Sequence, residues 1–240
     1  MMMFNNLLTR IRQVFQQRPL KAQFAQTQLI LILCLTIGSL AVTGVSLLSR
    51  QFEVPLSYFT RDPAAITETA FYIGALSSLG IALWSATAGI CFFGAAILVR
   101  SPRHQYDARF FLASGLISSM LALDDAFLLH EAFFPLYLQF PERGIYLVYL
   151  LLVSGFLFYF RTYILETDYL LLFLAFMFMG SGMAVEFLFP FSELETFAED
   201  SLKFFGILFW LGYFARATST TLRLNLLYAE GHPSWIRSQR

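Results

Sequence analysis

Apolar residues fill six long runs of the chain, and shorter polar stretches separate these runs. Each run approaches the ~20 residues that an α-helix needs to cross a hydrocarbon core of ~30 Å. In lipid, a helix satisfies the backbone polar groups of such a segment internally. The pattern therefore predicts an all-α, polytopic membrane protein with six transmembrane helices. The predicted spans cover residues 28–48, 70–99, 110–133, 144–161, 168–189 and 197–218.

The segments outside the spans complete the predicted organisation. The amino-terminal segment contains no acid and alternates apolar positions at helical spacing with basic ones, which is typical of an amphipathic helix on a membrane surface. The connection at 49–69 holds Pro55 and Pro63, and we expect an irregular or partly helical loop there. The predicted domains are this amino-terminal segment at 1–26, a transmembrane domain at 27–218 and a tail at 219–240.

Composition supports a membrane protein and excludes other classes. Apolar residues make up 58% of the chain and charged residues 13%, a balance that is too apolar for an ordinary soluble domain. The formal net charge is zero, so no overall basic field attracts nucleic acid. The sequence contains no P-loop or GxGxxG pattern, and we expect no nucleotide partner. The expected partner is membrane lipid.

Basic side chains beside the predicted spans are unevenly distributed. Twelve Lys and Arg residues lie on the side that holds both termini, and three, Arg50, Arg61 and Arg143, lie on the other side. By the positive-inside rule, both termini are then cytoplasmic. We expect a multi-pass protein of a bacterial plasma membrane, or of a thylakoid membrane if the source is photosynthetic.

Ionisable side chains interrupt the apolar pattern at one level of the predicted bundle. In the orientation above they fall in the outer half of the membrane, and intramembrane charges mark functional sites by default. Three spans can therefore bring carboxylates to one pocket. The third span contributes Asp124, Asp125, His130 and Glu131, the fifth contributes Glu186, and the sixth contributes Glu199, Asp200 and Lys203.

The spacing of these residues predicts their directions on ideal helices, at ~100° per residue. Asp124 and Glu131 are seven positions apart and nearly eclipse one another, with Asp125 beside them, so they form one acidic stripe. His130 projects roughly 120° from Asp124, so either the helix bends and His130 joins the stripe, or His130 faces a different neighbour. Glu186 shares its face with Gly182, a small residue that permits close helix approach.

Several carboxylates and one imidazole at the same depth suit two kinds of chemistry. A divalent metal would relieve the repulsion between the carboxylates and activate water. Alternatively, one carboxyl group could act as general acid and base without metal. The candidate metal ligands are Asp124, Asp125, His130, Glu131, Glu186 and Glu199, and the candidate catalytic residues are Glu131, Glu199, Asp200 and Lys203.

Three classes of function fit this site. The first is a metal-dependent hydrolase that acts on a lipid or membrane peptide. The second is a proton- or cation-coupled transporter, although no inverted repeat or pair of broken helices supports alternating access. The third is a non-catalytic subunit or assembly factor, in which Lys203 pairs with Asp124 or Asp125 and the acids only lock the helices together. Trp84 and Tyr149 are interpreted as interfacial anchors or packing residues.

Two motifs carry resemblances to known families. LDDAFLLHE in the third span, with Glu186 near the end of the fifth span and EDSLKFFG opening the last, resembles a group of uncharacterised bacterial multipass membrane proteins. That group carries an LDE-then-IHE helix followed by a paired-acid helix. Residues 199–203 are also similar to the EExxK motif of PrsW-type and CAAX-type intramembrane proteases, with Asp200 in place of the second glutamate. The second resemblance implies a protease in which His130 supplies the histidine that those families place on later helices.

Overall fold

The computed structural model of the chain describes residues 20–60, 63–70, 72–188 and 192–229. Every regular element in these ranges is a helix, which confirms the predicted all-α class. The chain divides into two compact units, Met1–Ile73 and Gly74–Arg240.

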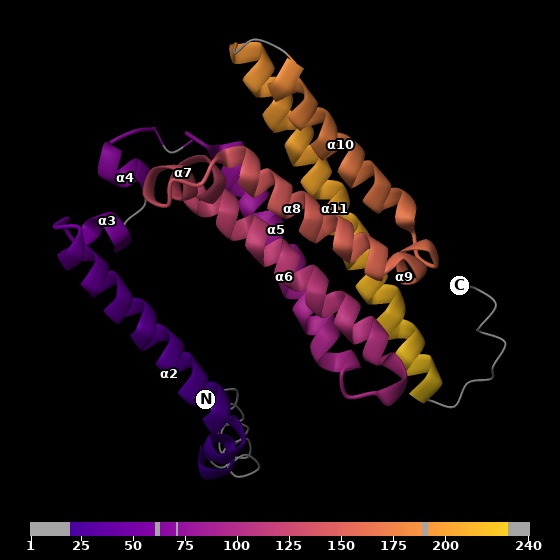
Figure 1. Cartoon of the computed structure of the whole chain (residues 1–240). Helices are drawn as coiled ribbons and strands as arrows, with labels where there is room; N and C mark the ends of the chain where they lie inside the picture. Colours follow the sequence, from indigo (N-terminus) through magenta and orange to yellow (C-terminus); the bar gives the residue numbers. More distant parts are fainter. Residues whose placement is uncertain (1–19, 61–62, 71, 189–191, 230–240) are drawn as a thin grey trace, which may run out of the picture. The chain divides into compact units, whose positions relative to one another are not determined.

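The described part of the first unit contains one long helix and two short ones (Figure 1). Helix α2 (Leu20–Gln51) covers the first predicted span and extends beyond it at both ends. Helices α3 (Ser57–Thr60) and α4 (Pro63–Thr67) lie in the connection after it, which confirms the predicted partly helical loop. Most of the predicted amphipathic segment, residues 1–19, lies outside the described residues.

Helices of the second unit cover the other five predicted spans. Most of their ends lie within a few residues of the predicted boundaries, but the last helix continues well into the predicted tail. The described helices are α5 (Ala75–Leu98), the 3-10 turn η1 (Pro102–His104), α6 (Gln105–Phe127), the π-turn η2 (Leu129–Phe133), α7 (Phe134–Tyr137), α8 (Glu142–Tyr159), α9 (Arg161–Leu165), α10 (Tyr169–Leu188) and α11 (Glu193–Ala229).

Three helices among the described residues, α5, α6 and α8, are long and apolar enough to cross a membrane. Helix α10 is apolar over the shorter stretch Tyr169–Val185. This length and composition fit a membrane protein. That α2, α10 and α11 also cross, which would give six spans with both termini on one side, stays a prediction.

Small residues allow two helices of the second unit to pack closely. Helix α5 packs against both α6 and α11, and α10 runs along α11 (Figure 1). A Cβ atom on Gly206 of α11 would lie 3.0 Å from the carbonyl oxygen of Ala175 in α10. A Cβ on Gly182 of α10 would lie 3.2 Å from the carbonyl oxygen of Glu199. The close approach predicted for the face of α10 that carries Gly182 is therefore confirmed.

An aromatic core joins α6, α8 and α11. The ring of Phe110, at the start of α6, stacks on Phe156 of α8 with centroids 5.5 Å apart and lies 5.8 Å from Phe214 of α11. All three side chains are buried. Aromatic pairs contribute roughly 0.5–1.5 kcal/mol each beyond the burial of their area. This core fixes α6 near its first residues, and the candidate site lies at its other end.

Candidate functional site

The last turns of α6 carry two adjacent aspartates with different neighbours. Neighbouring positions on a helix differ by ~100°, so the two carboxylates face different helices. Asp124 contacts η2 and α8, whereas Asp125 contacts α5 and α11. The site therefore consists of two groups of contacts. They are the Asp124 set, with His130 and Tyr149, and the Asp125 set, with Trp84 and Lys203.

The Asp124 set is a buried carboxylate with three hydrogen bonds. The Tyr149 hydroxyl donates to Oδ1 of Asp124 at 2.7 Å, and the backbone N–H of His130 donates to the same oxygen at 3.1 Å. The imidazole Nδ1 of His130 lies 2.5 Å from the second carboxylate oxygen. Asp124 is 3% exposed and His130 is 7% exposed. A buried carboxylate with these partners is well satisfied.

A break at the end of α6 brings His130 to Asp124. The helix ends where Leu128 takes the left-handed conformation, with φ 49° and ψ 46°, and residues 129–133 then form η2. The prediction that Asp124 and Glu131 eclipse one another is therefore wrong, because it required a continuous helix through the third span. His130 was expected to reach Asp124 if this helix bends. The helix does break at Leu128, and His130 contacts Asp124.

The second ring nitrogen of His130 faces Glu131. Its Nε2 lies 3.4 Å from Oε1 of Glu131, whose side chain is 55% exposed. Because Nδ1 faces the Asp124 carboxylate, Nδ1 carries a proton, and Nε2 of the neutral ring then presents a lone pair. A lone pair and a carboxylate repel one another, so a proton or another cation between them stabilises this arrangement. One carboxylate thus orients the imidazole, and a second, exposed carboxylate faces its free nitrogen.

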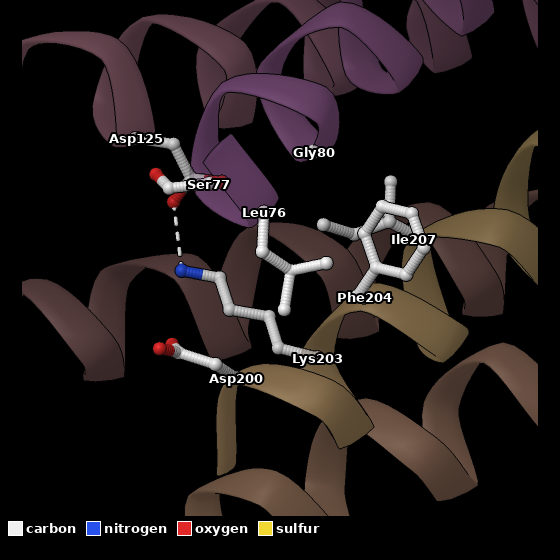
Figure 2. Close-up of a pocket in the computed structure, with 8 residues that line it drawn as sticks. All are labelled: Leu76, Ser77, Gly80, Asp125, Asp200, Lys203, Phe204 and Ile207. Carbon is white, nitrogen blue, oxygen red and sulfur yellow. Dashed lines mark hydrogen bonds and ion pairs between the residues drawn. The ribbon is translucent and has the colours of Figure 1, made fainter. Parts of the chain in front are cut away.

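The Asp125 set joins three helices at one carboxylate. Nζ of Lys203 in α11 donates to Oδ1 of Asp125 at 2.9 Å, drawn as the dashed line in Figure 2. The indole N–H of Trp84 in α5 donates to Oδ2 at 3.1 Å. The pairing of Lys203 with one of the two aspartates, expected if the acids lock the helices together, is therefore present. The side chain of Asp125 is 12% exposed and that of Lys203 is 41% exposed.

A small pocket opens beside this ion pair, between α5, α6 and α11 (Figure 2). Asp200 of α11 lines the pocket together with Asp125 and Lys203, and most of the other lining residues are apolar. A Cβ atom on Gly80 of α5 would lie 3.2 Å from Cδ1 of Ile207, so glycine keeps this wall open. The lining residues are Leu76, Ser77, Gly80, Asp125, Asp200, Lys203, Phe204 and Ile207.

The remaining candidate ligands are less closely gathered. Glu199 lies where the backbone of α11 packs against Gly182 of α10. The side chain of Glu186, one turn further along α10, lies outside the described residues. Among the residues that the structure describes, no three His, Cys, Asp or Glu side chains lie close enough to hold a metal ion. The candidate ligands Asp124 and Asp125 belong to separate sets.

Two aromatic residues have roles that the sequence did not reveal. Trp84 and Tyr149 were interpreted as anchors or packing residues, and each proves to donate a hydrogen bond to an aspartate. Trp84 is 2% exposed, so its indole N–H requires an internal acceptor. Trp84 and Tyr149 lie on other predicted spans at about the depth of the two aspartates. That shared depth was the sequence signal for these two hydrogen bonds.

The helices and the site together fit one class of protein, a helical membrane protein with a polar cluster at one end of its apolar helices. Within that class the chain belongs to a family described as a domain of unknown function, DUF8692, whose family model matches residues 29–217. This agrees with the resemblance to uncharacterised proteins. No curated protein and no solved structure matches the chain. The comparisons therefore show no similarity to PrsW or CAAX proteases.

Proposed function

We propose that the protein is an integral membrane hydrolase that acts on a lipid or a membrane peptide. Both termini lie in the cytoplasm, and the site lies in the outer half of the membrane. The observation that carries this proposal is the contact between Nδ1 of His130 and the buried Asp124, with Nε2 directed at Glu131. A carboxylate that fixes the tautomer and orientation of an imidazole prepares it to act as a general base.

Each group of the Asp124 set has its own role in the proposed hydrolysis. Asp124 holds the imidazole ring, while Tyr149 and the backbone N–H of His130 hold the carboxylate. His130 accepts a proton at Nε2 from a water molecule that attacks an ester or amide carbonyl. Glu131 stabilises the imidazolium that forms. The proton then passes from Nε2 to the leaving oxygen or nitrogen, which completes hydrolysis.

A metal-dependent form of the same hydrolase would use Nε2 of His130 and the carboxylate of Glu131 as ligands. Both groups are common ligands of divalent ions, and a carboxylate behind the ligating histidine is a common arrangement. Glu186 on α10 would be the third ligand in this form of the proposal. The ion would supply an activated water molecule.

The Asp125 set supports a second candidate, a non-catalytic subunit or assembly factor. Its ion pair and its indole hydrogen bond connect α5, α6 and α11 through one carboxylate. Such contacts serve helix packing in a membrane and need no reaction to explain them. In this candidate the acids hold the helices in the arrangement that a partner protein recognises.

A hydrolysis assay on the full chain tests the first candidate against the second. The protein in nanodiscs is incubated with a panel of phospholipids, glycolipids and a membrane-embedded peptide, and the products are measured by mass spectrometry. We expect hydrolysis by the wild type and a rate at least ~100-fold lower for His130→Gln, the range that general-base catalysis supplies. His104 contacts Asp107 at the opposite end of α6, so His104→Gln is the matched control and should retain the rate.

Metal content measured on the same preparations separates the two forms of the hydrolase. Near-stoichiometric metal that is lost in a folded Glu131→Gln, Glu186→Gln double variant supports the metal-dependent form. Hydrolysis without bound metal supports His130 as the general base. If folded wild-type protein hydrolyses nothing in the panel, or if His130→Gln retains the full rate, the hydrolase proposal fails and the subunit candidate stands.

A further inference from the structure

The connection between α6 and α8 is almost entirely apolar, and many of its large side chains are exposed. Residues 127–140 read FLLHEAFFPLYLQF, in which His130, Glu131 and Gln139 are the only side chains that are neither apolar nor aromatic. Soluble proteins rarely expose so many large apolar side chains side by side. Seven of them are exposed in this segment, while His130 is buried: Phe127, Leu128, Phe133, Leu136, Tyr137, Leu138 and Phe140.

The connection at the other end of α6 has a different chemistry. Residues 99–105, which join α5 to α6, read VRSPRHQ and include two arginines. Both connections adjoin the same apolar helix, so each lies near a membrane surface when α6 crosses the bilayer. The polar connection has the composition of a water-facing loop. The 127–140 segment has the composition of a surface that contacts lipid.

The backbone of the 127–140 segment satisfies many of its polar groups internally. The amide of Ala132 donates to the carbonyl of Leu128, and the amide of Phe140 donates to the carbonyl of Phe134. The buried aspartate at the end of α6 accepts a backbone N–H of η2. An unpaired amide against acyl chains costs several kcal/mol, so internal pairing is a condition for contact with lipid.

We infer that the 127–140 segment lies in the membrane interface and that its partner is the lipid surface. The two helices that it joins, α6 and α8, are both long and apolar enough to cross a membrane, so the segment continues from one span to the next at the membrane boundary. Two residues with left-handed backbone, Leu128 and Gln139, lie near its two ends and turn the chain out of α6 and back toward α8. Tyr137 is the kind of residue that membrane interfaces favour.

The interfacial placement of the segment also bears on the substrate of the proposed hydrolase. This inference about the substrate rests on the proposed function. The ring of His130 lies 5.3 Å from that of Tyr146 in α8, so α8 covers one side of the imidazole. Glu131, on the exposed side, is surrounded in sequence by apolar side chains. A molecule that reaches this carboxylate from the lipid therefore meets an apolar surface throughout. The apolar surroundings of Glu131 favour an ester-linked membrane lipid, whose carbonyl groups lie at the interface, as the substrate.

Spin labels on the full chain in nanodiscs test the placement without any activity. A nitroxide is attached at Leu136→Cys and, in a second variant, at Leu138→Cys, both in a background in which Cys34 and Cys91 are replaced by alanine. Accessibility to oxygen, which partitions into lipid, is compared with accessibility to a water-soluble nickel chelate. The lipid reference is Leu150→Cys in the middle of α8, and the water reference is Arg103→Cys.

The ratio of oxygen to nickel accessibility decides the outcome. We expect both labels in the segment to give a ratio several-fold above that of the Arg103→Cys label and below that of the Leu150→Cys label, because oxygen is most concentrated at the centre of the bilayer. A ratio equal to the water reference would overturn the inference, and so would labels shielded from both reagents, because a protein partner would then cover the segment. Because the measurement needs no substrate, failure of the hydrolysis assay leaves its result unaffected.

Discussion

Asp124 and Asp125 balance their charges in different ways. Asp125 is paired with Lys203, whose charge is permanent at neutral pH, whereas the cation available to Asp124 within its set is a histidine. A buried carboxylate that loses its partner costs several kcal/mol, so each aspartate depends on its own set. The permanent pair suits a structural role. The imidazole of the other set can gain and lose a proton, which suits chemistry.

A double-mutant cycle on Asp125 and Lys203 measures the structural pair. We expect Asp125→Asn and Lys203→Met each to lower the free energy of unfolding, because each leaves the other charge without its partner. Lys203 is partly exposed and therefore screened, so we expect a coupling of about 1 kcal/mol from denaturant unfolding in mixed micelles.

The exposed pair between Arg216 and Asp168 is a matched control for this cycle. Arg216 Nε lies 2.5 Å from Oδ2 of Asp168, but both side chains are about half exposed or more, at 62% and 49%. Solvent screens such a pair, so we expect no measurable coupling there. Equal coupling in the two cycles would contradict a special role for the Asp125 set.

At the scale of the helices, the sequence indicated most positions but not the break in α6. The apolar run at 110–133 continues through Leu128, which has no tendency to end a helix. A leucine in the left-handed conformation costs roughly 1–2 kcal/mol. Contacts between elements offset this cost, among them the backbone N–H of His130 donating to Asp124. Periodicity along one helix carries no information about such contacts, so angular reasoning placed Glu131 wrongly.

The close contact between α10 and α11 gives a prediction at the same scale. A Cβ on Gly206 would meet backbone atoms of Ala175 and Met179 at 3.0 Å, so Gly206→Ala must push the two helices apart. We expect a loss of roughly 1–3 kcal/mol in stability, the usual cost of overpacking. Thermal unfolding in detergent, followed by circular dichroism, measures it.

Gly212, also on α11, is the control for this substitution. A Cβ at Gly212 would meet no atom within 4 Å, so Gly212→Ala should be neutral or should stabilise the helix by up to about 1 kcal/mol. If both substitutions lower the unfolding temperature equally, close packing at Gly206 is not the cause.

For the whole molecule, composition and apolar runs were enough to predict a helical membrane protein, because the bilayer leaves few alternatives to a helix. Lys203 was expected to pair with one of the two aspartates if the acids lock the helices together, but the sequence did not say which one. The parts played by Trp84 and Tyr149 remained hidden, since a buried aromatic residue has the same pattern with or without a polar partner. Composition was therefore enough to predict the class of protein. The partners of the two aspartates became visible only in the contacts between helices.

The uneven distribution of basic residues gives a prediction for the whole chain. If both termini are cytoplasmic, Arg103→Cys and Arg223→Cys lie inside and Arg143→Cys lies outside. In intact spheroplasts we expect a membrane-impermeant maleimide to label Arg143→Cys alone, and to label the other two only after permeabilisation. Labelling of Arg103→Cys without permeabilisation would contradict the orientation. Labelling of both Arg143→Cys and Arg223→Cys, but not of Arg103→Cys, would contradict the number of spans.

Because the two carboxylates stand on consecutive residues of α6, this helix connects the Asp124 set with the Asp125 set. Asp124 and Asp125 cannot turn independently, because the helix carries them at a fixed angle. A rotation of α6 that draws Asp125 away from Lys203 of α11 would therefore also move Asp124 relative to Tyr149 of α8. An event that displaces α11, such as the docking of another helix, would therefore act on the Asp124 set as well as on the Asp125 set.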